Sequence, residues 1–193
     1  MKITTNTKEI LKELTRKEKK HIPEATYWAL KNTAKKVQTA LEVQTEKKLD
    51  RPTRFTQKAF GIQWPKRNKL GLTTRIYIKD IQAEYLRWMI EGGTNTNKGK
   101  KIPVPTNNAR VNKFGNIPGK KSGVVKNKQE IRKTKTGGGV WTKTKVPKLI
   151  IAFKDSITYA KDRYPFYKIG YSVVNNVYPK ELTKSLRKEM QKK

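Results

Sequence analysis

The sequence predicts an α+β fold: a long N-terminal helix packs on a small, mainly antiparallel sheet, C-terminal helices close the domain, and a long basic segment is inserted. Three observations lead to this prediction. Apolar residues recur at helical spacing between residues 23 and 49. Apolar and polar residues alternate at 60–64 and again at 72–78, which is typical of strands. Residues 98–148 carry fifteen Lys or Arg against a single acid, Glu130, so this segment differs in composition from its surroundings.

Two helices are expected at the N-terminus. Asn6 and Glu9 have the spacing of a capping box, which predicts a short helix over residues 7–20. His21–Pro23 is interpreted as a joint, because proline is tolerated in the first turn of the helix that follows. This second helix should end near Leu49. The residues expected to face its core repeat at spacings of three and four: Tyr27, Leu30, Ala34, Val37 and Leu41.

A hairpin and a central helix are expected next. The alternating stretches 60–64 and 72–78 should pair as two strands with one apolar face. The central helix begins after Asp80, a residue type that caps helices. It ends at Gly92-Gly93, because glycine tolerates the left-handed backbone that a helix end often needs. Its buried stripe is expected to contain Ile81, Tyr85, Trp88 and Met89.

The second half of the chain returns to the same domain after the basic segment. Ile102–Pro105 should be extended, because each proline biases the preceding residue away from helix. Residues 106–148 leave two alternatives open, a loose hairpin or disorder until a partner binds. Strands are expected at 149–153 and 157–160, a helix at 164–177 and a last helix from Pro179. One domain would then comprise residues 1–97 and 149–193, with 98–148 as a basic arm.

The composition favours an anionic partner and sequence-independent contact. The formal net charge is +31, which is most easily tolerated beside nucleic acid. Only ten of the 46 basic residues are arginine, the side chain that reads guanine edges, whereas lysine binds phosphate as a point charge. The chain has no cysteine for a disulfide or a thiolate metal site. With no signal peptide and no apolar run of membrane-spanning length, we expect a soluble protein made in a cytoplasm, with no membrane association.

The basic segment is the candidate surface for contact with nucleic acid or an acidic lumen. It carries a net charge of +14, and neutralising phosphates releases counterions without requiring a fixed geometry. An acidic protein surface stays open as the alternative partner. Phe114 and Trp141 are the aromatic residues of the segment that could stack on bases. The expected contact residues are Lys98, Lys100, Lys101, Arg110, Lys113, Lys120, Lys121, Lys126, Lys128, Arg132, Lys133, Lys135, Lys143 and Lys145.

The sequence does not argue for an enzyme. The single histidine, His21, has neither a second histidine nor a cysteine with which to hold a metal. Asp80, Glu84 and Glu91 lie near one face of a helix, as Mg²⁺ ligands of a nuclease would, but capping and solvated salt bridges explain them. Gly137–Gly139 lacks the Lys-Ser/Thr of a phosphate-binding loop. We expect no catalytic residues, metal or cofactor, and a Mg²⁺-dependent nuclease is the rival hypothesis.

Two stretches resemble proteins of tailed bacteriophages. Residues 85–94, YLRWMIEGGT, and the extended IPVP at 102–105 are similar to a pattern of the HK97 gene-product-10-like neck and tail-completion group. The order of helix, basic middle, strand and a final helix opening with PKEL at 179–182 resembles the minor tail protein Z family. The residues that carry the resemblance are Tyr85, Glu91, Gly93, Thr94, Pro103 and Pro105.

The resemblance implies a structural virion protein of the tail or neck. It would lie at the head-proximal end of the tail, near the DNA channel, and join tail to head. Its implied partners are the tail terminator, tail tube or head–tail connector proteins, non-specific DNA, and copies of itself in a ring. The narrow apolar stripe of the last helix, at a chain end that a neighbour could cover, is the candidate protein interface: Leu182, Leu186 and Met190. The alternative function is a non-specific nucleic-acid-binding protein of ribosomal or nucleoid type.

Overall fold

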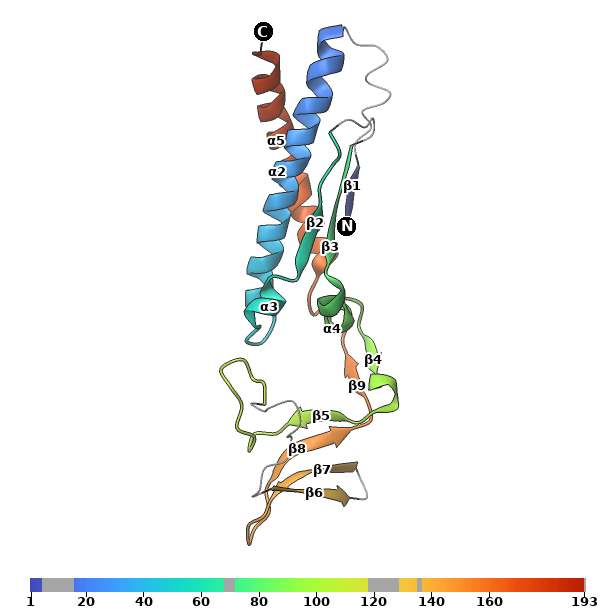
Figure 1. Ribbon diagram of the computed structural model, residues 1–193, viewed down its shortest axis with the longest axis vertical. Coiled ribbons are helices and arrows are strands. Elements are labelled where there is room, and N and C mark those ends of the chain that lie inside the picture. Colours follow the sequence, from blue (N-terminus) through green and yellow to red (C-terminus); the bar gives the residue numbers. More distant parts are fainter. Residues whose placement is uncertain (5–15, 68–71, 118–128, 135–136, 193) are drawn as a thin grey trace. The chain divides into compact units, whose positions relative to one another are not determined.

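The protein has an α+β fold with a long N-terminal helix, a long C-terminal helix and small antiparallel sheets (Figure 1). The computed structural model describes residues 1–4, 16–67, 72–117, 129–134 and 137–192. Most of the helix expected at 7–20 lies outside these residues. The chain divides into two compact units, the first made of residues 1–48, 54–85 and 164–193, the second of residues 49–53 and 86–163.

The first unit is built on two long helices that lie side by side, α2 (Arg16–Lys48) and α5 (Phe166–Met190) (Figure 1). Each runs through an internal proline, Pro23 in α2 and Pro179 in α5. The expected helix breaks at these two prolines are therefore wrong. A proline inside a helix removes one hydrogen bond and strains the preceding turn, and the packing of α2 against α5 outweighs that local cost.

The buried face of α2 is the one that its apolar periodicity predicted. Four of the five expected core residues are at most 1% exposed, namely Leu30, Ala34, Val37 and Leu41. The fifth, Tyr27, is half-buried and makes an edge-to-face contact with Trp28 at 5.4 Å between ring centres. Ala25, Ala29 and Thr33 are also fully buried, and small side chains on a helix allow a neighbouring element to approach closely.

The inner face of α5 is polar in its C-terminal half. The buried residues there, Glu181, Ser185 and Glu189, recur every fourth position. Glu181 accepts hydrogen bonds from Asn32 Nδ2 at 3.0 Å and from Lys36 Nζ at 2.6 Å on α2. These hydrogen bonds lower the pKa of Glu181, because both donors favour the ionised carboxylate. These hydrogen bonds connect α5 to α2 at a position where the sequence has no apolar residue that would predict helix packing.

A buried tyrosine makes a second polar connection between α2 and the start of α5. The Tyr164 hydroxyl donates to the Leu41 carbonyl at 2.8 Å and accepts a hydrogen bond from Thr45 Oγ1 at 3.2 Å. Its ring stacks on Phe60 with 6.0 Å between centres. Burial raises the pKa of Tyr164 to about 12, because the low-dielectric surroundings disfavour the phenolate.

The sheet of the first unit has the strand order β1-β3-β2 and is antiparallel throughout. It contains β1 (Lys2–Thr4), β2 (Phe60–Gln63) and β3 (Thr73–Ile78), and the short helix α3 (Arg54–Gln57) precedes β2. The expected hairpin is confirmed as β2 and β3, whereas the sequence did not indicate β1. Leu72, Thr74 and Ile76 are buried, so alternate residues of β3 face the helices.

The boundary between the units falls inside α4 (Asp80–Glu91). Its extent agrees with the prediction, and Gly92 ends it with a positive φ of 73°. The expected buried stripe is wrong: Ile81 is 67% exposed, Tyr85 is exposed, and Trp88 and Met89 are half-buried. The buried positions are instead Gln82, Leu86 and Ile90. A polar residue can take the inner position here because Gln82 Nε2 donates to the Phe55 carbonyl at 3.3 Å.

The second unit contains two antiparallel sheets, of two and four strands. In the smaller sheet β4 (Gly93–Asn95) pairs with β9 (Ile157–Tyr159). The 3₁₀ turn η1 (Asn97–Gly99) leads to the larger sheet, whose strand order is β5-β8-β7-β6. Its strands are β5 (Ile102–Pro105), β6 (Gln129–Thr134), β7 (Gly137–Thr142) and β8 (Leu149–Lys154).

The basic segment therefore supplies strands to a sheet. The predicted extended stretch 102–105 is confirmed as β5, and the predicted strand 149–153 is confirmed as β8. For residues 106–148 the structure shows the hairpin alternative, because β6 and β7 form an antiparallel pair. Val140, Ile150 and Ile151 form a buried cluster. Gly139 is required beside them, because a Cβ there would lie 2.4 Å from the Ile151 carbonyl oxygen.

We expect Leu41→Ala to lower the free energy of unfolding by about 2–5 kcal/mol, because the side chain is 1% exposed and leaves a cavity between α2 and its neighbours. Urea unfolding followed by circular dichroism measures the change. The control Val43→Ala lies two residues away and is 45% exposed, so its effect should stay within about 0.5 kcal/mol. Equal effects of the two variants would contradict the assigned helix face.

The raised pKa of Tyr164 predicts a loss of stability in alkaline solution. Folding favours the neutral phenol, so its contribution is complete below pH 10 and disappears as the pH rises toward about 12. The difference in unfolding free energy between the wild type and Tyr164→Phe should therefore shrink across this window. Tyr171→Phe, at a 54% exposed position, is the control and should follow the wild type at every pH.

Candidate functional site

Nine of the fourteen expected contact residues lie in the described part of the chain, all in the second unit and all exposed. They are Lys98, Lys100, Lys101, Arg110, Lys113, Arg132, Lys133, Lys143 and Lys145. The remaining five, Lys120, Lys121, Lys126, Lys128 and Lys135, lie outside the described residues. The second unit therefore presents cations from several elements and not from one continuous arm.

These cations occupy both ends of the four-stranded sheet and one of its edges. Lys98 lies within η1 and Lys100 directly after it, just before β5, and Ile102 at the start of β5 lies opposite the end of β8. Lys143 and Lys145 lie in the turn between β7 and β8, so they are at the opposite end. Arg132 and Lys133 lie on β6, an outer strand of this sheet. The structure thus does not gather the predicted residues into one patch.

Most of these cations have no anionic partner within the described residues. Lys101 pairs with Asp155, and Arg132 pairs with Glu130, the one acid of the basic segment. Lys98, Lys100, Lys143 and Lys145 make no ion pair with any residue that the structure describes. Such lysines are available to neutralise phosphates, and their separation along the sheet suits contacts with a backbone at several points.

The two aromatic residues of the segment are both half-buried. Lys113 Nζ lies 5.1 Å from the centre of the Phe114 ring, so charge and aromatic surface occur together in the loop after β5. Trp141 belongs to β7, and its indole Nε1 is buried without a hydrogen-bond partner among the described residues. Stacking of bases on these rings stays a prediction.

The residues of the phage-like pattern form the junction between α4 and the sheets. Glu91 is the last residue of α4, and Gly93 follows with a φ of 109° as the first residue of β4. Thr94 Oγ1 lies 3.1 Å from Thr158 Oγ1 across the β4–β9 pair. Pro103 and Pro105 lie on β5, an outer strand, where a missing N–H is tolerated. These residues build the passage from α4 to the strands of the second unit.

Tyr85 has a contact of its own within the first unit. Its hydroxyl lies 3.0 Å from Thr56 Oγ1, although the ring is 38% exposed. This hydrogen bond connects the first half of α4 to α3. Tyr85, the tyrosine of the phage-like pattern, therefore helps to hold the first half of α4 in place against α3.

The residues weighed for metal chemistry are scattered. Asp80, Glu84 and Glu91 are all exposed on α4, and His21 is buried on α2. Across the ranges that the structure describes, no three His, Asp or Glu side chains converge as a metal site would require. Across the same ranges, no helix has the length and apolar character needed to span a membrane.

The candidate protein interface lies beside the inner face of α5. Leu182 and Leu186 are half-buried, and Met190 is 45% exposed. Each follows one position after a buried polar residue of the same helix. The stripe therefore retains apolar surface that a neighbouring protein could cover.

A second group of cations, which the sequence did not lead us to expect, lies on the exposed side of α5. Lys180, Lys184, Arg187 and Lys188 are exposed and line a shallow groove of about 520 Å³. Their spacing of four, three and one residues places them along one side of a helix. A search for charged residues at helical spacing could therefore have identified them.

Comparison of this chain with protein families, curated proteins and solved structures found no match. Its function is therefore argued from the residues and their geometry.

We expect duplex DNA of random sequence to bind with a strong dependence on salt. Replacing Lys98, Lys100, Lys143 and Lys145 by glutamine should reduce the slope of log affinity against log salt by about 0.9 for each lysine that contacts phosphate. Fluorescence anisotropy at several salt concentrations measures the slope.

The matched control replaces four exposed lysines of the first unit by glutamine: Lys35, Lys47, Lys48 and Lys168. It removes the same charge from residues outside the second unit. An equal loss of slope in this control would show that net charge alone, and not the second unit, determines binding.

Proposed function

We propose that this protein is a structural, non-enzymatic tail-completion or neck protein of a tailed bacteriophage. It acts at the head-proximal end of the tail and joins tail to head near the DNA channel. The observation that carries the proposal is the set of exposed lysines on the second unit that lack an anionic partner within the described residues, Lys98, Lys100, Lys143 and Lys145.

Lysine-rich surfaces of this kind suit DNA that is contacted in any sequence. A genome that passes through a channel presents every sequence in turn, so a useful contact must depend on phosphate alone. Lysine supplies this as a flexible point charge, and 36 of the 46 basic residues are lysine. The distribution of these lysines over both sheet ends supports several shallow contacts in preference to one deep, sequence-reading site.

The phage assignment is supported by the pattern from Tyr85 to Pro105. Four residues of this pattern lie where the chain passes from a helix to strands. Glu91 and Gly93 make the turn from α4 into β4, and the two prolines lie on β5. This turn sets the end of α4 at Glu91 and the start of β4 at Gly93. The resemblance therefore rests on residues that shape the protein backbone.

The partners follow from charge and from the apolar stripe of α5. A net charge of +31 makes identical copies repel one another in dilute solution, so the isolated protein should be largely monomeric. In the virion, DNA and acidic neighbours would offset this repulsion and allow a ring to form. The tail terminator, tail tube or head–tail connector would cover Leu182, Leu186 and Met190.

A nucleic-acid-binding protein that acts outside a virion is the second candidate. The cationic groove on α5, lined by Lys180, Lys184, Arg187 and Lys188, favours it, because the first unit then has a basic surface of its own. Such a protein should purify with cellular nucleic acid and should show no preference for phage tails or connectors. Both properties can be measured on the purified chain.

We expect Leu186→Asp with Met190→Asp to block head–tail joining, because the two charges disrupt the apolar stripe. The test uses a phage in which the gene is deleted and supplied from a plasmid, and electron microscopy counts joined particles, free heads and free tails. Because Leu186 is half-buried, circular dichroism must confirm that the variant folds.

Met190→Asp alone, at a position that is 45% exposed, keeps the test valid if the double variant fails to fold. Gln191→Asp adds the same charge at an adjacent exposed position and should leave joining intact. Normal infectious virions that lack the protein altogether would end the tail-completion proposal.

A further inference from the structure

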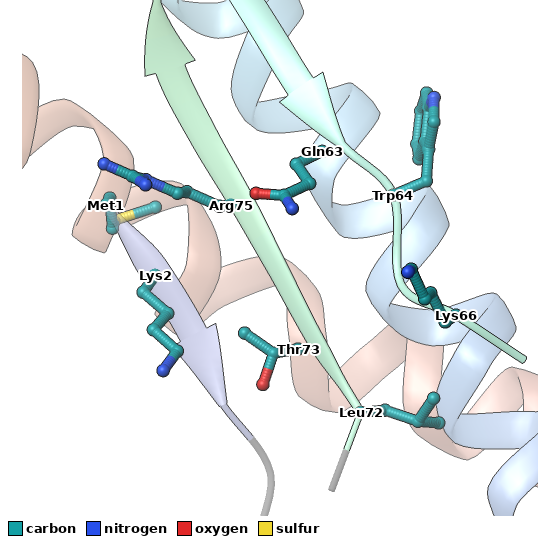
Figure 2. Close-up of a pocket in the computed structure, with 8 residues that line it drawn as sticks. All are labelled: Met1, Lys2, Gln63, Trp64, Lys66, Leu72, Thr73 and Arg75. Carbon is teal, nitrogen blue, oxygen red and sulfur yellow. The ribbon is translucent and has the colours of Figure 1, made fainter. Parts of the chain in front are cut away.

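The first unit has a cavity of about 670 Å³, and Figure 2 shows the residues that line it. It opens on the outer side of the three-stranded sheet. Lys2 lies opposite Arg75 in the β1–β3 pair, and Arg75 lies opposite Gln63 in the β2–β3 pair. Residues paired in this way project from the same face of the sheet, which is the face away from the buried Thr74 and Ile76.

Among the residues that the structure describes, the lining of this cavity carries positive charge and includes no carboxylate. Lys2, Lys66 and Arg75 line it, and all three are exposed. The sequence explains the imbalance, since residues 51–79 include eight Lys or Arg and no acid. Three cations around one hollow repel one another in the absence of an anion, so a bound anion would stabilise the arrangement. The cavity therefore has the electrostatics of an anion site.

An exposed tryptophan adds a planar surface to the same cavity. Trp64 follows the end of β2, precedes the buried Pro65 and is 45% exposed. Lys31 Nζ lies 6.0 Å from the centre of its ring. Trp28, by comparison, donates its indole N–H to Glu24 Oε1 at 2.8 Å and so is held within the fold. Trp64 is the aromatic ring that the cavity presents to a ligand.

We propose that this cavity binds a nucleotide unit, with its phosphate on Lys66, Arg75 and Lys2 and its base against the Trp64 ring. A cavity of this size lies within the range of about 300–1,000 Å³ that small-molecule sites occupy. The shared chemistry, a phosphate beside an unpaired planar base, is offered by a free nucleotide or by single-stranded nucleic acid. A duplex hides the faces of its bases, so this site is distinct from the duplex contacts of the second unit.

The test measures binding of three probes to the full chain: thymidine monophosphate, a short oligothymidylate, and an abasic oligomer of equal length. Trp64→Leu should weaken oligothymidylate binding about tenfold and leave the abasic oligomer unchanged, because only the base stacks. Trp64→Phe retains a ring and should recover much of the missing affinity. Equal weakening of the base-containing and abasic oligomers would overturn the proposal.

The charge of the cavity is tested separately. Lys66→Gln with Arg75→Gln should weaken both oligomers and lower the salt slope by about 0.7 for each phosphate that the variant no longer neutralises. The control, Lys35→Gln with Lys47→Gln, removes two exposed charges of α2 outside the cavity and should leave the base-dependent affinity unchanged. A polyglutamate peptide that competes as well as oligothymidylate would show that the cavity recognises charge alone, and would overturn the assignment to nucleotides.

The position and the source of the ligand require two further measurements. An oligomer that carries bromodeoxyuridine should photo-crosslink at Trp64, and crosslinks confined to residues 98–148 would overturn the proposal. Binding of thymidine monophosphate with the same Trp64 dependence identifies a free nucleotide as sufficient, whereas binding of the oligomer alone identifies a strand. The variant with four glutamines in the second unit should retain this dependence even if the phage assignment fails.

Discussion

The packing of α5 against α2 is the interaction on which the first unit depends. The two helices bring the two ends of the chain together, and the sheet β1-β3-β2 then lies against α2. Two polar connections fix their register: Glu181 binds Asn32 and Lys36 near the middle of α2, and Tyr164 binds the Leu41 carbonyl. Because Glu181 and Tyr164 are buried, shifting one helix along the other would leave hydrogen-bonding atoms without partners.

Several of the fifteen acids make contacts within the fold. Glu24 holds Arg67 and Trp28, Glu181 holds Lys36, and Glu130 and Asp155 each neutralise one cation of the second unit. The Arg67 hydrogen bonds lower the pKa of Glu24, as the Lys36 and Asn32 contacts lower that of Glu181. Among the described residues, these four carboxylates are paired elsewhere and none lines the cavity beside Trp64.

Periodicity predicted the elements whose packing depends on apolar side chains. The α2 face through Leu41 and the β2–β3 hairpin were predicted correctly, because burial and hydrophobic pattern coincide there. It failed where polar residues are buried, as at Gln82 of α4, and where tertiary packing overrides a local breaker, as at Pro179. Gly137–Gly139 has no apolar pattern that would predict a strand, whereas the structure places it on β7, where Gly139 lies close to Leu149 and Ile151. The Trp64 cavity could not be predicted, because it adds residues of β1, a strand that the sequence did not indicate, to those of the β2–β3 hairpin.

The two outer strands of the four-stranded sheet determine whether that sheet can grow. On β5, two of four residues are proline and have no N–H to offer another strand. On β6, where no described strand pairs with the outer side, Arg132 and Lys133 would meet the same charges in an approaching copy. Both edges therefore resist edge-to-edge aggregation. At high concentration the chain is protected in this way from polymerising through its backbone.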